Sequence, residues 1–175
     1  MKLRHTTPAT RSLVRLATIA LAAGALGLPL AGQAATRNTT FQVTATVLKS
    51  CRITATDLAF GDYDPYLTAP LDATSTITVR CTKNTTYNVG LNAGTFGGAT
   101  VTARKMTGPD AAGLGYALYR DSAYTNNWGN TAGTDTESGT GTGVSQTFTV
   151  YGRIPVDQWV EAGSYADTIT ATITY

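Results

Sequence analysis

Histidine and cysteine are scarce in this sequence. Its single histidine, His5, lies near the N-terminus, and its two cysteines are Cys51 and Cys81. Without another histidine, the rest of the chain cannot form a Ser-His-Asp or Cys-His nucleophile system. It also lacks the usual ligands of zinc and copper sites. These absences argue against an enzyme, and we expect no cofactor.

The N-terminal segment is organised like a secretory signal peptide. Its four basic residues are Lys2, Arg4, Arg11 and Arg15. An apolar run from Leu16 to Leu30 follows, and Gly32-Gln33-Ala34 provides the small residues of a cleavage site. The alternative is a membrane anchor, but this run is short and rich in Ala and Gly. We predict export with cleavage after Ala34.

The exported part carries little net charge. Of the 13 basic residues, four belong to the predicted signal peptide, which leaves 9 against 11 acidic residues. This balance predicts no nucleic-acid partner and no polybasic membrane surface. Because the chain is exported, Cys51 and Cys81 should form a disulfide. Two free thiols are the alternative.

Two strand patterns stand at the ends of the exported chain. Phe41, Val43, Ala45 and Val47 alternate with polar residues, after a polar lead. The segment from Gly163 to Tyr175 alternates Tyr165, Ile169, Ala171, Ile173 and Tyr175 with threonines. A period of two with β-branched residues predicts half-buried strands. No sequence follows the last strand to pair with it, so either earlier segments or another chain must complete it.

Several further strands are predicted between these ends. They are Cys51 to Ala55, Thr74 to Cys81, Tyr87 to Leu91, Thr100 to Met106, Leu114 to Tyr119 and Val144 to Arg153. We expect Tyr87 to Leu91 to be the hairpin partner of Thr74 to Cys81, and Val144, Phe148 and Val150 to enter the core. Residues 62–70 and 120–142 are predicted loops. No helical stripe occurs, so the pattern predicts an all-β sandwich.

Few loop residues suggest chemistry. Asp62, Asp64 and Asp72 could form a calcium site, but aspartates are common in proline-containing turns. Trp128 and Trp159 could stack on sugars, although we expect core or loop-anchoring roles. The Gly139–Gly143 run lacks the lysine and helix of a phosphate-binding loop, so we interpret it as a hairpin tip.

Several segments resemble the spore coat protein U domain family, which includes subunits of archaic (Csu-type) chaperone–usher pili. The resemblance rests on all of these segments occurring together and in this order, since no single segment identifies the family. They are Phe41–Cys51, Leu58–Tyr63, Ser75–Cys81, Tyr116–Asp121, Val150–Pro155 and Ala162–Tyr175.

The resemblance implies an incomplete immunoglobulin-like β-sandwich, pilin-like and lacking its last strand. It implies three parts: a signal peptide (1–34), an N-terminal donor-strand segment (35–49) and the sandwich domain (50–175). The donor residues would be Phe41, Val43, Ala45 and Val47. The acceptor edge strand would contain Ile169, Ala171, Ile173 and Tyr175. The Cys51–Cys81 pair matches the family disulfide.

The function implied is that of a structural subunit, not an enzyme, which polymerises by donor-strand exchange into a pilus for adhesion and biofilm formation. Its partners would be copies of itself or related subunits, a periplasmic chaperone and an outer-membrane usher, and it would pass through the periplasm to the cell surface. The alternatives are a spore or cell coat protein and a surface-binding adhesin module of the same fold. A tip adhesin usually has an extra domain before the pilin domain, and a donor strand would be needless there.

Overall fold

A computed structural model of the protein describes Gly32 and residues 34–175. The predicted signal peptide, residues 1–34, therefore lies outside the described residues except for Gly32 and Ala34. The chain divides into two units, residues 1–43 and 44–175, and each is described by itself. Residues 34–50 contain no strand or helix. Among the described residues, no helix is long and apolar enough to cross a membrane.

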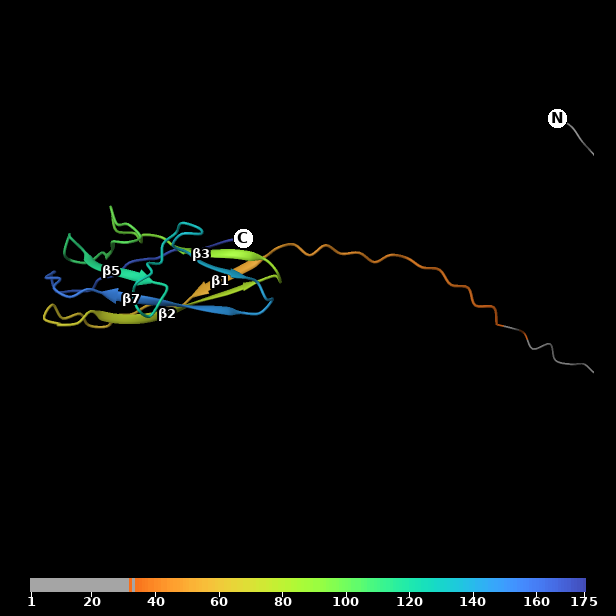
Figure 1. The fold of residues 1–175 in the computed structure, drawn as a ribbon, viewed down its shortest axis with the longest axis horizontal. Coiled ribbons are helices and arrows are strands. Elements are labelled where there is room, and N and C mark those ends of the chain that lie inside the picture. Colours follow the sequence, from red (N-terminus) through yellow and green to blue (C-terminus); the bar gives the residue numbers. More distant parts are fainter. Residues whose placement is uncertain (1–31, 33) are drawn as a thin grey trace, which may run out of the picture. The chain divides into compact units, whose positions relative to one another are not determined.

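The larger of two sheets has five strands in the order β1-β2-β7-β5-β4, all antiparallel to their neighbours (Figure 1). Their bounds are β1 Cys51–Ala55, β2 Leu71–Cys81, β4 Arg104–Met106, β5 Leu114–Tyr119 and β7 Gln146–Ile154. The central pair is long: its register runs from Leu71 opposite Ile154 to Val79 opposite Gln146. A disulfide links Cys51 to Cys81, which face each other across β1 and β2.

The smaller sheet has three strands in the order β6-β3-β8. They are β3 Thr86–Leu91, β6 Glu137–Thr140 and β8 Ala171–Thr174. The prediction that Tyr87 to Leu91 forms a hairpin with the preceding strand is wrong, because β3 pairs with β6 and β8. The turn after β2, which contains Asn84 with φ 60°, instead carries the chain into the other sheet.

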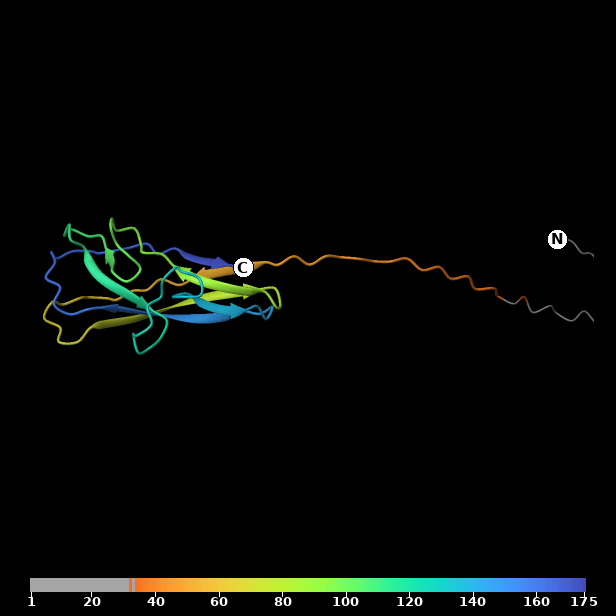
Figure 2. The ribbon, with the colours of Figure 1, turned by 45° about the horizontal axis from the view of Figure 1, so that its top comes forward.

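The core lies between the two sheets, which form the layers seen in Figure 2. Alternate residues of β2, β3, β5 and β7 point into it, as the period of two predicts. Its most buried apolar members are Ile77, Val79, Tyr87, Val89, Leu91, Leu118, Trp128 and Ile154. The prediction of an all-β, immunoglobulin-like sandwich is confirmed. At β1 and β8 each sheet ends in an edge strand.

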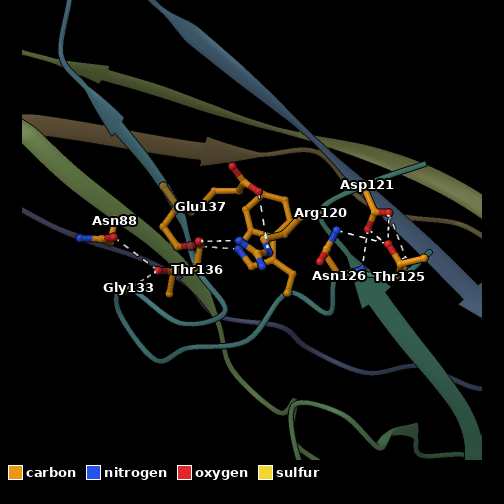
Figure 3. Close-up of polar contacts among 10 residues, drawn as sticks. Asn88, Arg120, Asp121, Thr125, Asn126, Gly133, Thr136 and Glu137 are labelled. Atoms are coloured by element: carbon orange, nitrogen blue, oxygen red, sulfur yellow. Dashed lines mark hydrogen bonds and ion pairs between the residues drawn. The ribbon is translucent and has the colours of Figure 1, made fainter. Parts of the chain in front are cut away.

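The long connection between β5 and β6 is anchored by one buried tryptophan. Trp128 is fully buried, and its Nε1 donates to the carbonyl of Val89 at 2.9 Å. Polar contacts secure the flanking chain (Figure 3): Arg120 Nη1 donates to the Thr136 carbonyl at 3.1 Å, and the Asp121 carboxylate accepts from the Asn126 amide at 2.7 Å. The core role of Trp128 is confirmed. Trp159, by contrast, is 64% exposed.

Three local predictions are wrong. Val144 is 64% exposed, because β7 begins two residues later and Val144 lies in the preceding turn. Residues 137–140, predicted as loop, form β6, where they pair with β3. The last strand is only Ala171–Thr174, and the residues before it make isolated contacts, such as the bridge between Thr107 and Ala166.

The two tryptophans provide a test of the core. Trp128→Ala should lower the free energy of unfolding by about 3–5 kcal/mol, because it leaves a large cavity and removes the hydrogen bond to Val89. Trp159→Ala is the matched control and should change it by about 0.5 kcal/mol or less. Urea unfolding of the mature chain, monitored by circular dichroism, measures the free energy of unfolding of both variants. Equal losses in the two variants would contradict this description of the core.

Candidate functional site

The candidate site is a groove of about 880 Å³ with an apolar floor, in the sandwich domain. One wall is the chain that continues from β1, residues 55–63, and the other is the chain that leads into β8, residues 160–171. Core side chains from both sheets form the floor. They include Ile77, Leu91, Met106, Leu114, Tyr116, Leu118, Val150 and Ile154.

The first wall is built by two apolar side chains that fold over the larger sheet. Leu58 and Phe60 lie above Gly152 of β7, where an added Cβ would come within 2.8 Å of Leu58 Cδ1 and 2.9 Å of Phe60 Cζ. The Phe60 ring also meets the Tyr116 ring edge-on, with centroids 6.3 Å apart. A side chain at position 152 would therefore displace Leu58 and Phe60.

The backbone of the first wall has few hydrogen-bond partners. β1 pairs with β2 as far as Ala55, and Thr56 donates to the Thr76 carbonyl at 3.0 Å. From Asp57 to Tyr63, no backbone N–H has a partner among the described residues. This wall therefore has the free donors and acceptors of an edge strand.

The second wall is hydrogen-bonded on one side only. Thr107 and Ala166 exchange two backbone bonds of 2.8 and 2.9 Å, and Asn92 donates to the Thr170 carbonyl at 3.2 Å. In an extended chain, neighbouring residues direct their backbone groups to opposite edges. The N–H groups of Tyr165, Asp167 and Ile169 consequently face the groove side, and none has a partner among the described residues. The groove thus lies between two unpaired backbone edges.

Asp167 fastens the second wall to the sandwich. Its Oδ2 accepts from the Tyr116 hydroxyl at 2.6 Å, and its Oδ1 accepts from the amide and hydroxyl of Thr95, both at 2.7 Å. Gly94, with φ 87°, makes room for this carboxylate: a Cβ there would lie 1.9 Å from Oδ2. Only glycine can occupy position 94 without strain, because any side chain there would collide with the Asp167 carboxylate.

These contacts govern the titration of both partners. Burial raises the pKa of Asp167, but the hydrogen bonds from Tyr116, Thr95 and Thr168 outweigh it and hold that pKa below its usual value. For Tyr116, burial comes first and the bond to Asp167 second, and both raise the pKa of the phenol. At neutral pH, the carboxylate is therefore the acceptor and the phenol the donor.

A buried arginine supports the floor beside this wall. Arg104 is 1% exposed, and its guanidinium donates to the carbonyls of four residues: Leu91, Asn92, Val101 and Trp128. Burial lowers the pKa of Arg104, although an arginine stays protonated at any physiological pH. Because Asn92 also bonds Thr170, Arg104 indirectly orders the chain that enters β8.

The structure places the predicted site residues as follows. Ile169, Ala171 and Ile173 are half-buried against the core, whereas Tyr175 is 56% exposed. All four predicted donor residues are exposed: Phe41 86%, Val43 85% and Val47 85%, with Ala45 in the same class. Their insertion into a groove stays a prediction, as do the proposed domain limits.

Sequence reasoning missed the residues that build the groove. Leu58 and Phe60 lie in a segment that carries only the family resemblance, while Asp167 and Tyr116 have no local sequence signal because they meet through the fold. The aspartates considered for calcium are used otherwise: Asp72 binds Arg153 at 2.7 Å and Asp64 accepts from the Tyr66 amide at 2.9 Å. No cluster of three metal-ligating side chains occurs in the described part of the chain.

Comparison with known proteins gives three matches. The family model for the Spore Coat Protein U domain matches residues 37–172. Protein U of Myxococcus xanthus is 37% identical over 128 residues, which are 67% of this chain and 71% of that protein. The third is a crystal structure of the CsuC–CsuE chaperone–tip adhesion subunit pre-assembly complex from archaic chaperone-usher Csu pili of Acinetobacter baumannii. One of its chains superposes with a TM-score of 0.54 at 28% identity; the match covers 74% of this chain and 40% of that one.

Asp167→Asn tests how the second wall is held. The change should lower the free energy of unfolding at pH 7 by about 1–3 kcal/mol, because it weakens several bonds to a charged acceptor. A carboxylate with a lowered pKa contributes stability above its unfolded pKa of about 3.9 and loses that contribution as pH falls through the lower folded pKa. The difference from the unmodified chain should therefore shrink below about pH 4.

Urea unfolding of both proteins between about pH 2 and pH 7 measures this difference. Asp62→Asn is the control, because Asp62 is exposed and its carboxylate has no hydrogen bond among the described residues. A pH-independent difference for Asp167→Asn would contradict the role of its charge.

Proposed function

Because the chain belongs to the Spore Coat Protein U domain family, we propose that it is an exported structural subunit that polymerises by donor-strand exchange into a chaperone–usher pilus. Residues 39–48 of one copy fill the groove of the next. Phe41, Val43, Ala45 and Val47 face its floor, and Ile169, Ala171, Ile173 and Tyr175 belong to the accepting edge. Adhesion and biofilm formation are the roles that such a pilus serves.

The groove with two unpaired backbone edges is the observation that carries this proposal. A strand inserted between residues 57–63 and 160–169 would satisfy the N–H groups of both walls at once. It would also cover the apolar floor, which an isolated domain leaves open. A strand added in trans is the known way to remove such an edge without adding residues to the domain.

The N-terminal segment has the pattern that this groove requires. Phe41, Val43, Ala45 and Val47 recur at every second residue, so these four face one side of an extended strand, whereas Leu48 faces the other. Phe41, Val43 and Val47 are each at least 85% exposed. Burial of each side chain would contribute about 1.5–3 kcal/mol before ordering costs, and main-chain bonds would add to that.

The partners follow from the same groove. In the Csu structure, a chaperone is in complex with a tip adhesion subunit. By analogy, we propose that a periplasmic chaperone covers the groove of this chain after export and that an outer-membrane usher catalyses the exchange for the next subunit. The chain would need no cofactor, and its role is structural, not catalytic. The polymer would stand on the cell surface.

A coat protein is the second candidate. The family description and the similarity to Protein U favour it, because neither refers to a pilus. A tip role draws less support, since the match covers only 40% of the solved chain from the Csu complex. A coat built by the same strand exchange would share the groove chemistry, so neighbouring genes for a chaperone and an usher would separate it from a pilus.

Polymerisation is tested by a pair of variants on opposite faces of the donor strand. Val43→Asp should abolish the ladder that unheated periplasmic material gives on a denaturing gel, because it places a charge in the apolar groove. Thr44→Asp is the matched control and should leave the ladder intact, since Thr44 faces away. Deletion of Ala35 to Val47 should give monomers only. A ladder that survives the deletion would refute donor-strand exchange.

Ala45 offers a finer test. We expect this small residue to leave a shallow contact in the middle of the donor strand, where one donor strand can begin to replace another. Ala45→Leu should stabilise the finished polymer against heat if its pocket accepts the larger side chain, and should slow the exchange from the chaperone. Gel assays of polymer melting and of chaperone release measure the two effects. Unchanged release and unchanged polymerisation would exclude this role.

A further inference from the structure

We propose that Lys49 of the incoming copy pairs with Asp62 and Glu161 at one end of the groove and thereby fixes the direction in which the donor strand lies. This inference rests on the proposed donor-strand exchange. The partner is a second copy of this chain, and the contact of Lys49 with the two carboxylates is electrostatic and lies at the junction between consecutive subunits.

The charges around the groove all have one sign. Its charged lining residues are Asp57, Asp62, Glu161 and Asp167, and no lysine or arginine lines it. Asp167 is committed to Tyr116 and Thr95. Asp57, Asp62 and Glu161 are exposed, and none of their carboxylates has an ion pair among the described residues; Asp57 follows the end of β1 by two residues, whereas Asp62 and Glu161 lie further along the two walls. They are therefore free to receive a cation.

The N-terminal segment has the opposite sign. Residues 35–50 contain Arg37 and Lys49 and no acidic residue. These two cations flank the alternating stretch and lie about 40 Å apart when the chain is extended. Only one of them can therefore reach Asp62 and Glu161, and the direction of the donor strand decides which.

The ends of the groove are distinct. β1 begins beside the C-terminus at one end of the sandwich, and the loops around residues 60–70 and 155–165 lie at the opposite, loop end (Figure 2). At the loop end the first wall is tied to the chain that precedes the second wall, since the Tyr63 hydroxyl donates to the Pro155 carbonyl at 3.1 Å and accepts from the Gln158 amide at 3.0 Å. Asp62 adjoins Tyr63 in the sequence and Glu161 follows Gln158 by three residues, so both belong to the chain segments of this end.

The short connection to β1 selects the direction. Only Lys49 and Ser50 separate the donor strand from Cys51, which the disulfide holds in place. The start of β1 in the donating copy must therefore abut the end of the groove from which the donor strand emerges. Emergence at the C-terminal end would bring like ends together, and two copies could exchange strands reciprocally and close as a dimer.

If the donor strand instead leaves at the loop end, the loop end of one copy meets the C-terminal end of the next. This contact can repeat along an open row of subunits without closing. A polymer therefore requires the donor strand to leave at the loop end, where Lys49 meets Asp62 and Glu161. Arg37 then lies at the other end, away from both carboxylates. Charges at the rim of an interface act mainly on the association rate and its salt dependence, so the effect belongs to assembly kinetics.

The experiment follows ladder growth of the full mature chain and four variants. Lys49→Glu should slow assembly about three- to tenfold at low ionic strength, and the difference should shrink at about 0.3 M salt. The double change Asp62→Lys with Glu161→Lys should slow it similarly. Combining all three changes should restore the unmodified rate. Arg37→Glu is the matched control and should stay within about twofold of the unmodified rate.

Restoration in the combined variant separates a direct pairing from a folding defect, because a misfolded chain would not be rescued by a further charge change. Assembly of Lys49→Glu at the unmodified rate, or failure of the combined variant to recover, would overturn the pairing. A larger loss from Arg37→Glu would reverse the strand direction and overturn it too. No ladder from the unmodified chain would overturn the proposed polymerisation itself, and with it this inference.

Discussion

Backbone hydrogen bonding is the constraint on which the whole groove depends. Where a chain segment lies against an apolar floor, each backbone N–H or C=O group without a hydrogen-bond partner costs free energy. In this sandwich, residues 57–63 and 160–169 both face that problem, because no strand of the described chain lies between them. A single added strand solves it for both walls, which is why the shape of the groove and its hydrogen-bond demand point to one kind of occupant.

A groove that receives a strand, as proposed, must keep its shape beforehand. Polar contacts of the second wall hold this shape. Asp167 ties the wall to Tyr116 of β5 and to Thr95, and Arg104 orders the adjoining carbonyls. Tyr116 belongs to the groove floor, so its bond to Asp167 fastens the second wall to that floor. The free edge is thereby held in place, which would reduce the ordering cost of receiving a strand.

Alternation predicted the strands well and their partners poorly. β1, β5 and most of β2 and β7 lie where the period of two placed them, because each buries one face. Tyr87 to Leu91 was assigned to the wrong neighbour, since a local pattern does not report that the Asn84 turn crosses between sheets. The last strand was expected to pair either with earlier segments or with another chain, and it pairs with β3. The contact between Asp167 and Tyr116 could not be expected, because 51 positions separate them and only the fold brings them together.

The connection between the donor segment and β1 also bears on whether a copy closes its own groove. To fold back along β1, which is an edge strand, the segment would need a two-residue hairpin at Lys49-Ser50. Such hairpins require positive φ at one or both turn residues, which Asn and Gly adopt and Lys and Ser disfavour. The folded-back strand would also run antiparallel to β1, the reverse of the direction inferred for the polymer. Turn chemistry therefore disfavours closure of the groove by the segment of the same copy.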